Sequence, residues 1–382
     1  MARTIFTDHR SYIVSARMAA LIAVLTSGGD APGMNAAIRA VVKVAASRRV
    51  EVVGVERGYD GLIDGDFRQL TRILDDRRDL APIAEVEGLG GLGGTLLGST
   101  RCPRFFHRDS REAACAQLTG QGLAGLVVIG GNGSMAGAHA LASECSIPVV
   151  GIPASIDNDI GLTREALGVD TALNTIVEAC DRISDTARSH HRAFIVEVMG
   201  RQSGYLAMSS AIATAADAVL LPEQSKTREE VIDSVTEAIR NSFATARDKH
   251  RVLVIKAEGV NVPTHELVEE VEKRLSDLAG VEVRSTVLGH LVRGGNASFR
   301  DRLLAGRFGL AAVDAVLAGT TDMMVGWTSP GSDRGTGTSD PYIRLFPLAE
   351  VLEETAALLD GTSAVALDRV RRMEAIQGIL AL

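Results

Sequence analysis

The chain has few aromatic residues, which make up 4% of its 382 residues, and it has no excess of positive charge. Proteins that bind single-stranded nucleic acid stack bases on aromatic side chains, and nucleic-acid-binding domains are usually basic. Here the formal net charge is −8. These properties argue against a nucleic-acid partner. They leave room for a small anionic substrate, because local arginines can override the global charge.

The chain also lacks long apolar runs. None approaches the roughly 20 residues that span a bilayer, so we expect no membrane partner. The first twenty residues contain Arg3, Arg10 and Arg17 but no continuous apolar segment, which argues against a secretory signal. We therefore expect a cytoplasmic protein in which residues 1–20 form a disordered N-terminal extension outside the core.

Cysteine is scarce as well, and its spacing suggests no special chemistry. The four cysteines form no CxxC pair and no zinc-binding pattern. Isolated thiols in apolar or helical surroundings are most simply reduced core residues. We expect this of all four, namely Cys102, Cys115, Cys145 and Cys180.

Glycine, by contrast, is plentiful, and the 39 glycines cluster where apolar runs end. The apolar runs rich in β-branched residues predict strands at 21–26, 50–55, 124–129, 147–152, 193–198, 217–221 and 251–257. Stretches of helical character lie between several of them, at 34–47, 133–144, 170–188 and 265–279. Strands that alternate with helices predict an α/β protein with a mainly parallel sheet. A further helix should begin at Thr227, where Glu230 completes a capping box.

Two aspartates follow the predicted strand 147–152 directly, in the sequence Pro-Ala-Ser-Ile-Asp-Asn-Asp. In open α/β sheets, ligands bind at the carboxyl ends of the strands. Asp157 could there accept a proton from a hydroxyl group while Asp159 helps to hold a cation near phosphate oxygens. The alternative is an Asx-turn that only ends a strand.

Two glycine loops join predicted strands to helices. Residues 26–35 read TSGGDAPGMN and residues 130–134 read GGNGS, and in both the backbone can approach a phosphate at a helix N-terminus. Neither is a Walker A loop, and a tight turn between strand and helix is the alternative reading. A literal GxGxxG at 88–93 does not follow a clear strand, so we do not expect it to bind a dinucleotide.

Arginines and one glutamate stand beside glycines at other strand ends. Arg101 closes the loop 93–101, and a loop arginine is a natural anion clamp. Arg192, Arg201, Arg284 and Arg293 occur in similar surroundings, and Glu258 follows the strand 251–257. His290 could bind a ligand or be a structural histidine. Phosphoryl transfer requires such a set of anion-binding groups, with Asp157 as our candidate base.

Six motifs in this order resemble the 6-phosphofructokinases: TSGGDAPGMNAAIR, GGTLLGSTR, GGNGS, PASIDND, EVMGRQSGY and RSTVLGHLVRGG. The similarity runs from about Leu21 to beyond Arg302. It implies the phosphofructokinase fold, two Rossmann-like three-layer α/β lobes with mainly parallel sheets. It also implies an ATP- and Mg²⁺-dependent kinase that phosphorylates fructose 6-phosphate in glycolysis. The family implies a homotetramer whose active sites are shared between subunits.

The resemblance also assigns roles to residues of this sequence. The catalytic set is Asp157, Arg201 and Gly29, with Asp157 as general base. The nucleotide site would comprise Gly29, Arg101, Cys102, Gly131, Asn132, Gly133 and Ser134. The sugar-phosphate site would comprise Ser155, Asp157, Arg192, Met199, Gly200, Arg201, Glu258, Arg284, His290 and Arg293, of which Arg192 and Arg284 reach across an interface. Asn132 and Asp159 would contact the metal.

The sequence departs from the family pattern at several positions. Asn132 replaces an aspartate near magnesium, which should weaken the metal site. Gly133 and Ala154 are small where the pyrophosphate-dependent branch has aspartate and lysine, so ATP is favoured as donor. Cys102 replaces a residue that is often aromatic, and Phe106 stands where an arginine is usual. A pyrophosphate-dependent enzyme and a catalytically weak, ligand-binding homologue are the alternatives.

The family's effector site is matched only in part. Arg39, Lys43, Asp217 and Lys249 fit it, whereas Ser184 stands where an arginine is common. For the two lobes we expect residues 21–168 plus about 292–345 to bind nucleotide. Residues 169–291 plus about 346–382 should then bind the sugar phosphate.

Overall fold

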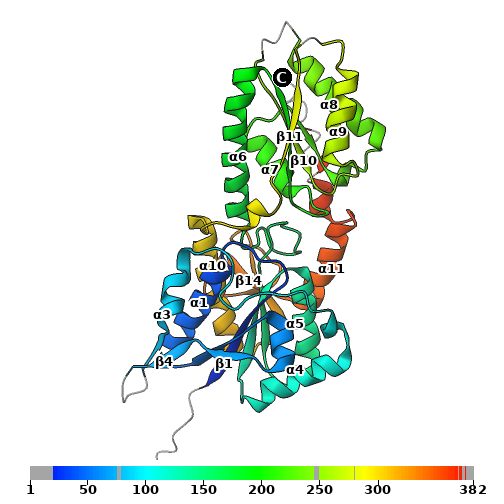
Figure 1. Ribbon diagram of the computed structural model, residues 1–382. Coiled ribbons are helices and arrows are strands. Elements are labelled where there is room, and N and C mark those ends of the chain that lie inside the picture. Colours follow the sequence, from blue (N-terminus) through cyan, green and yellow to red (C-terminus); the bar gives the residue numbers. More distant parts are fainter. Residues whose placement is uncertain are drawn as a thin grey trace, which may run out of the picture.

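A computed structural model describes residues 20–74, 79–244, 249–278, 280–368, 370–371 and 375. The expected N-terminal extension therefore lies outside the described residues, apart from Ala20. Two α/β lobes, each built on its own sheet, stack on one another (Figure 1). None of the helices in the described part of the chain is long and apolar enough to cross a membrane.

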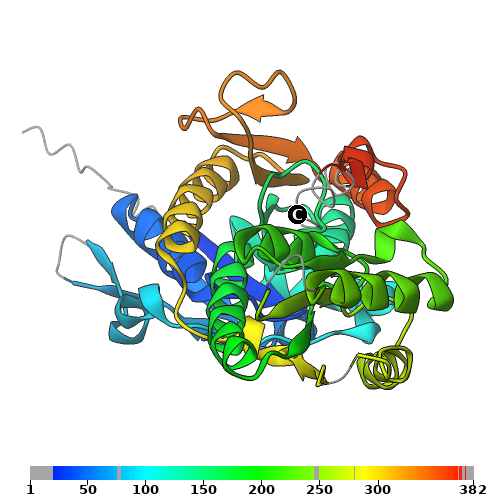
Figure 2. The same cartoon turned by 90° about the horizontal axis from the view of Figure 1, so that it is seen from above.

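The larger sheet has eight strands in the order β13-β14-β12-β7-β6-β1-β2-β3. Its inner strands β12, β7, β6, β1 and β2 run parallel, whereas β3, β13 and β14 add antiparallel pairs at the two edges. The bounds are β1 Leu21–Ser27, β2 Glu51–Val55, β3 Phe67–Gln69, β6 Gly125–Gly130, β7 Val149–Pro153, β12 Met323–Trp327, β13 Thr336–Gly337 and β14 Ile343–Pro347. The hairpin of β13 and β14 projects from the rim of this lobe (Figure 2).

The smaller sheet has four strands, all parallel, in the order β11-β8-β10-β9. The strands are β8 Ala193–Val198, β9 Ala218–Leu220, β10 Val252–Ala257 and β11 Val283–Val287. A separate antiparallel pair joins β4 Thr71–Ile73 to β5 Leu80–Pro82. Both main sheets are thus largely parallel, which confirms the predicted fold class.

Helices cover both faces of each sheet. In the larger lobe α1 and α10 lie on one face and α4 and α5 on the other, while in the smaller lobe α6 stands opposite α8 and α9 (Figure 1). The α-helices are α1 Met34–Ser47, α2 Gly58–Asp64, α3 Ala84–Glu87, α4 Arg108–Gly120, α5 Asn132–Glu144, α6 Val169–His190, α7 Tyr205–Ala213, α8 Arg228–Ser242, α9 Thr264–Arg274, α10 Phe299–Leu317 and α11 Leu348–Leu359. The 3₁₀ helices are η1 Gly88–Gly91, η2 Pro103–Phe106, η3 Pro222–Gln224 and η4 Gly289–Arg293.

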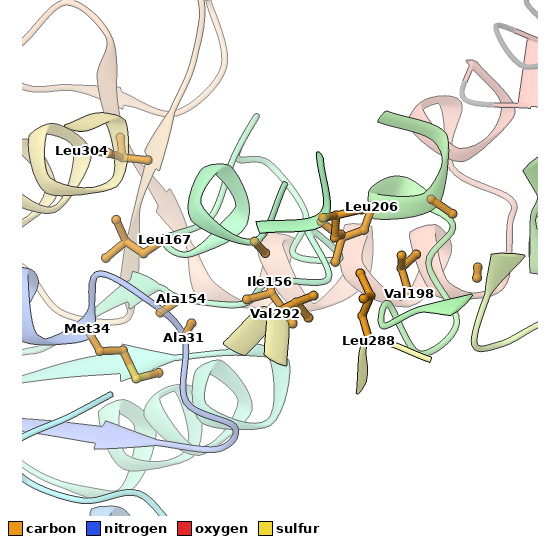
Figure 3. Close-up of a cluster of buried hydrophobic side chains, with 14 of the residues drawn as sticks. Ala31, Met34, Ala154, Ile156, Leu167, Val198, Leu206, Leu288, Val292 and Leu304 are labelled. Carbon is orange, nitrogen blue, oxygen red and sulfur yellow. The ribbon is translucent and has the colours of Figure 1, made fainter. Parts of the chain in front are cut away.

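The two lobes share one continuous apolar core. Ile156, from the loop after β7, lies beside Val292 and Leu288 of the segment that returns from the smaller lobe (Figure 3). Val198 and Leu206 continue the same cluster into the smaller sheet. Because each of these side chains is at most 8% exposed, the junction between the lobes is a packed interior rather than a hinge filled with water.

All seven predicted strands are present, as are the four predicted helices, although α9 ends at Arg274 rather than at residue 279. The Thr227 side chain accepts from the backbone N–H of Glu230 and the Glu230 carboxylate accepts from the N–H of Thr227, which confirms the predicted capping box. The GxGxxG segment 88–93 forms η1 directly after the helix α3. It therefore lacks the strand that a dinucleotide-binding loop follows.

One prediction about the cysteines is wrong. Cys115 of α4 and Cys145, just after α5, form a disulfide with Cα atoms 5.4 Å apart. Thirty residues separate them in sequence, and only the packing of α4 against α5 brings them together. Cys102 and Cys180 are free thiols, of which only Cys180 is buried.

The lobe boundaries remain a prediction, but the position of α11 bears on them. We expected residues from about 346 onward to belong with the sugar-phosphate lobe. Leu348 and Val351 of α11 instead pack in the core cluster formed by α5, β12 and β14 of the larger lobe. The end of α11 reaches toward the smaller lobe (Figure 1).

Candidate active site

A cavity of about 500 Å³ opens at the carboxyl ends of β1, β6 and β7. This is the edge of a parallel sheet at which α/β proteins bind ligands. Twelve of the predicted site residues line it, namely Gly29, Arg101, Cys102, Gly131, Asn132, Gly133, Ser134, Ser155, Asp157, Asp159, Arg201 and Arg293. Segments that are distant in sequence thus meet in one space.

The loop between β1 and α1 forms one wall of the cavity. Gly28 and Gly33 have φ angles of 88° and 97°, in the left-handed region that favours glycine. A Cβ on Gly29 would come within 3.1 Å of Nη1 of Arg293, which itself donates to the carbonyl oxygen of Asp30 at 3.0 Å. Arg293 therefore packs directly on this glycine loop and brings its charge to the cavity.

Side chains behind the first loop tie it to the loop 93–101. The Asn35 amide nitrogen donates to the carbonyl of Gly93, and its oxygen accepts from the N–H of Leu96 at 2.7 Å. Ser99 donates to the carbonyl of Gly28 at 2.6 Å. These hydrogen bonds hold the segment that ends in Arg101, so the arginine reaches the cavity mouth from a fixed base.

The second glycine loop joins β6 to α5. The Ser134 hydroxyl donates to the carbonyl of Ser27 at 2.9 Å and so links this loop to the first. The first N–H groups of α5 lack intrahelical acceptors, as at any helix N-terminus, and they lie where the cavity begins. A Cβ on Gly133 would meet no atom within 4 Å, so this position leaves open space for a ligand.

An apolar wall extends the cavity beyond the glycine loops. The rings of Tyr59 and Phe105 stack with centroids 4.1 Å apart, and the Tyr59 hydroxyl donates to the carbonyl of Ser134 at 2.6 Å. Phe106 lines the rim and is 86% exposed. Arg111 supports this wall, since it bonds to Glu144 and to the carbonyls of Phe105 and Phe106. Sequence reasoning did not find this wall, apart from the unusual Phe106.

The aspartate loop after β7 forms the floor of the cavity. Asn158, between the two aspartates, has a φ of 48° and is fixed by hydrogen bonds to the backbone of residues 164 and 166. Asp159 accepts from Asn132 Nδ2 at 2.8 Å and from the Ser155 hydroxyl at 3.0 Å. The Ser155 hydroxyl also accepts from the N–H of Asp157 at 3.3 Å, so serine and asparagine side chains fix the backbone that carries the two carboxylates.

Two buried oxygens at this floor have no hydrogen-bond partner among the described residues, namely Oδ1 of Asp157 and Oδ1 of Asn132. Burial, together with the neighbouring charge of Asp159, raises the pKa of Asp157 to about 6 against the opposing effect of Arg293 and Arg201. Within the described part of the chain, no group of three or more His, Cys, Asp or Glu side chains is placed to hold a metal.

Arg201 approaches the cavity from the smaller lobe. Its φ is 50°, and that of Gly200 is 146°, so the backbone is strained here. The Glu258 carboxylate accepts from the N–H of Gly200 at 3.3 Å and from the N–H of Arg201 at 2.6 Å. These bonds join the loops after β8 and β10, and they hold the backbone from which Arg201 reaches the cavity.

The remaining predicted sugar-phosphate residues lie outside this cavity. Arg192 and Arg284 both form ion pairs with Glu282, at 2.8 and 2.9 Å, on the outer part of the smaller sheet. His290 is exposed on η4. Met199 and Gly200 precede Arg201 in the loop after β8, as Glu258 follows β10. One chain therefore does not gather the whole predicted set at the cavity.

Comparison with known proteins shows which family has these loops. A family model described as Phosphofructokinase matches residues 21–316. The chain belongs to the phosphofructokinase family. It is 48% identical over 304 residues to the ATP-dependent 6-phosphofructokinase of Thermotoga petrophila, a match that covers 80% of this chain and 88% of that protein. It is 43% identical over 298 residues to the enzyme of the same name from Aquifex aeolicus, covering 78% and 87%.

Solved phosphofructokinase structures share the fold. The Pichia pastoris phosphofructokinase in the T-state superposes with a TM-score of 0.80 at 30% identity, over 95% of this chain. This chain spans 40% of that longer protein. A pyrophosphate-dependent phosphofructokinase from Marinobacter aquaeolei has a TM-score of 0.70 at 21% identity, which shows a common fold only. The family resemblance and the fold class are thus confirmed.

The residues that match the family's effector site fall into two groups in this structure. Lys249 pairs with the buried Asp217 at 2.8 Å in the smaller lobe. Arg39 and Lys43 on α1 both face Glu87 in the larger lobe. Ser184 is buried in α6. The four matching residues are not gathered at one place within a single chain.

Proposed function

We propose that this protein transfers the γ-phosphoryl group of ATP to the 1-hydroxyl of fructose 6-phosphate. The products are ADP and fructose 1,6-bisphosphate, and the reaction belongs to glycolysis in the cytoplasm. The observation that carries the proposal is a single cavity in which two glycine loops, Arg101 and an unpartnered oxygen of Asp157 face one another. The similarity to ATP-dependent 6-phosphofructokinases supports the same reaction.

Asp157 is the general base in this proposal. With a pKa of about 6, the carboxylate is ionised at neutral pH but basic enough to take a proton. The sugar oxygen loses its proton to Asp157 as it attacks the γ-phosphorus, and the bond from phosphorus to the bridging oxygen of ADP breaks. The guanidinium groups of Arg201 and Arg293, which already act on the Asp157 carboxyl, lie close enough to offset negative charge on the transferred group.

The donor half of the site uses mostly backbone groups. The loops at Gly29 and at Gly131–Ser134 would hold the phosphates with N–H groups, and Arg101 would clamp them from the rim. The stacked Tyr59 and Phe105 offer an apolar surface for a nucleoside, with Cys102 beside it. The open space at Gly133 leaves room for an α-phosphate. This room supports ATP over pyrophosphate as the donor.

The floor of the cavity fits Mg²⁺. Oxygen ligands suit this hard cation, and the unpartnered Asn132 Oδ1 beside the carboxylate of Asp159 provides them. These two residues would hold the ion, which when bound supplies charge that neutralises phosphate oxygens. Asn132 also donates to Asp159 and so fixes the carboxylate in place.

The sugar phosphate would lie between the lobes. Ser155, Met199, Gly200, Arg201 and Glu258 would contact the sugar. His290 and Arg293 would contact its 6-phosphate, and Arg192 and Arg284 would come from a neighbouring subunit of a homotetramer. Arg192 and Arg284 lie outside the cavity, where Arg192 pairs with Glu282 and Arg284 pairs with Glu282 and with Glu272 of α9, and this position supports a role across an interface.

Initial rates with two phosphoryl donors test this function. Purified protein with Mg²⁺ and fructose 6-phosphate should form fructose 1,6-bisphosphate with ATP, and at least tenfold more slowly with pyrophosphate, a difference of about 1.4 kcal/mol. Absence of product with ATP would refute the proposal. A preference for pyrophosphate would refute the donor assignment alone.

Asn132 favours a second candidate, a catalytically weak homologue that mainly binds ligands. An aspartate at this position would carry one more negative charge toward a cation. Under our proposal, Asn132→Asp changes turnover by less than about tenfold, because Asn132 keeps an oxygen toward the cavity. An Asn132→Asp protein that is far more active than the parent would favour the weak homologue instead.

A further inference from the structure

An ion pair between a buried lysine and a partly exposed glutamate joins the two central strands of the smaller sheet. Lys256 on β10 is 1% exposed, and its Nζ lies 3.0 Å from Oε2 of Glu197 on β8. The two residues are direct partners in the parallel register of these strands. Glu197 Oε2 also accepts from the hydroxyl of Thr264, the first residue of α9. Both strands are interior strands of the sheet.

Stability alone does not explain a charged pair at this place. Two apolar side chains of similar volume usually serve a sheet interior as well or better, because burial removes charge from water, here that of Lys256. The adjacent residues Val196 and Ile255 are apolar and fully buried. A charged pair differs from an apolar pair because its hydrogen bond is directional. A short N–H···O contact therefore allows the two strands to slide past one another less than apolar packing does.

The position of the ion pair in the two strands indicates which part of the site it holds in place. Glu197 stands two residues before Met199, and Lys256 stands two residues before Glu258. Each strand ends one residue after its charged residue, and each then continues into a loop proposed to bind the sugar. The pair therefore joins the two strands one position before their last pairing, Ala257 with Val198.

The loops after β8 and β10 keep their conformation only if the two strands before them are correctly aligned. Gly200 and Arg201 have positive φ, and a Cβ on Gly200 would lie 2.4 Å from the carbonyl oxygen of Ser203. Glu258 holds this strained turn through the N–H groups of Gly200 and Arg201. A shift of β10 relative to β8 would move the Glu258 carboxylate away from both donors.

On one side of the ion pair, side-chain packing does little to hold the two strands in place. A second cavity, of about 480 Å³, is bordered by Glu197, Lys256, Glu258, His265 and Ser285. Where a cavity replaces side-chain contacts, neighbouring atoms do not resist a small displacement. The ion pair and the Thr264 hydroxyl then act together with the backbone hydrogen bond from the N–H of Glu258 to the carbonyl of Val198, at 2.9 Å, to hold the strand ends on this side.

We propose that Lys256 is a positioning residue for the sugar-phosphate half of the site. Through Glu197 it aligns β10 with β8, and the alignment places Glu258 and the turn at Met199–Arg201. The inference rests on the proposed function for its substrate. It leaves the donor half unaffected, because that half is built on the larger sheet.

The test is a Lys256→Met variant with both substrates measured separately. The KM for fructose 6-phosphate should rise about tenfold, as expected when one charge-assisted hydrogen bond no longer holds a binding loop. The KM for ATP should stay within about twofold, whereas kcat should also fall, because the displaced turn carries Arg201, which in our proposal offsets charge on the transferred group. Amide hydrogen exchange in residues 199–204 should become faster.

Two variants separate positioning from general stability. Glu197→Gln keeps an acceptor for Lys256 and Thr264, so the rise in sugar KM should be smaller than in Lys256→Met. Arg240→Met removes an ion pair of the same lobe, between Arg240 and Asp277, and should leave the sugar KM unchanged. An Arg240→Met variant with the same tenfold rise would overturn the positioning role.

Direct binding keeps this inference distinct from the proposed function. Calorimetric titration with fructose 6-phosphate measures sugar affinity without turnover, and exchange of residues 199–204 requires no ligand. A wild-type protein without phosphoryl transfer would refute the function but not the alignment, which faster exchange in Lys256→Met would still support. Unchanged exchange together with unchanged sugar affinity in Lys256→Met would overturn the proposal.

Discussion

The carboxyl edges of the two sheets are built differently. At the larger sheet, glycine loops, Arg101 and the aspartate loop enclose a cavity, and the aspartates are buried. At the smaller sheet, Arg201, Glu258, Arg284 and His290 are exposed, and Glu258 is held by backbone N–H groups. The first edge is formed by one chain. We infer that the second edge is completed by another subunit.

This difference indicates which contacts fix the positions of the residues in each half of the site. The donor half relies on main-chain groups and short side-chain bonds, such as Ser134 to Ser27 and Asn35 to Leu96. The sugar half relies on charged side chains whose positions depend on strand alignment and, in our proposal, on a neighbour. Variants should therefore separate effects on the two substrates.

The largest expected effect is that of Asp157→Asn. The amide cannot accept the sugar proton, so kcat should fall about 10²–10⁴-fold, the usual contribution of a general base. Affinity for fructose 6-phosphate should stay within a few fold, because the amide nearly preserves the shape of the side chain. Steady-state kinetics and calorimetric binding measure the two quantities. Near-normal turnover would contradict the role of Asp157 as the general base at the donor edge.

Reduction of the disulfide between α4 and α5 should lower the stability of the protein. Cys115 and Cys145 close a loop of about thirty residues between α4 and α5, and such a loop is expected to contribute about 3–4 kcal/mol to the free energy of unfolding. Denaturant unfolding with and without a thiol reductant measures the loss. The reductant should have no further effect on a Cys115→Ser variant. Equal unfolding midpoints for the oxidised and reduced wild type would contradict this contribution.

Glu165, in the loop between the aspartates and α6, should make stability depend on pH. Burial raises its pKa from 4.5 to about 7, although Arg300 opposes the shift. Between these values the unfolded chain is ionised while the folded chain keeps the proton, so stability falls as pH rises from about 4.5 to about 7. A shift of this size corresponds to about 3 kcal/mol at most.

A Glu165→Gln variant tests this pH dependence. Glutamine mimics the protonated acid, so the variant should gain stability relative to wild type as pH rises from 5 to 8, while its own curve flattens over about that range. The exposed Glu178→Gln variant is the control and should follow wild type at every pH. A constant difference between Glu165→Gln and wild type would contradict the assignment.

Much of the donor edge could be predicted from the sequence, because its residues follow strands directly. Gly29, Asn132 and Asp157 each stand within a few residues of a recognisable apolar run, and parallel strands bring such positions to one edge. The alternation of strands and helices likewise predicted a mainly parallel sheet, whereas the two lobes were implied by the resemblance to the 6-phosphofructokinases. For these features, local sequence was sufficient.

The rest depends on contacts between distant segments. The disulfide requires the packing of α4 on α5, and the position of Arg293 on the loop at Gly29 joins residues 264 positions apart. The pair of Lys256 and Glu197 requires the register of two parallel strands, which neither strand reveals alone. Side chains that meet only after folding carry no pattern in the local sequence.

Mixing two impaired variants tests the central claim most directly. Asp157→Asn lacks the base, and Arg284→Ala should lose sugar affinity by about tenfold or more, since a charge-assisted contact to the phosphate is missing. We predict that hybrids, formed by unfolding and refolding the two together, regain activity at low sugar concentration. Such recovery requires sites that combine an intact Asp157 with an intact Arg284 from its neighbour. Our account holds that one chain forms the donor edge and that a neighbouring subunit completes the sugar edge. A hybrid whose activity is no higher than the sum of the two separate variants would contradict it.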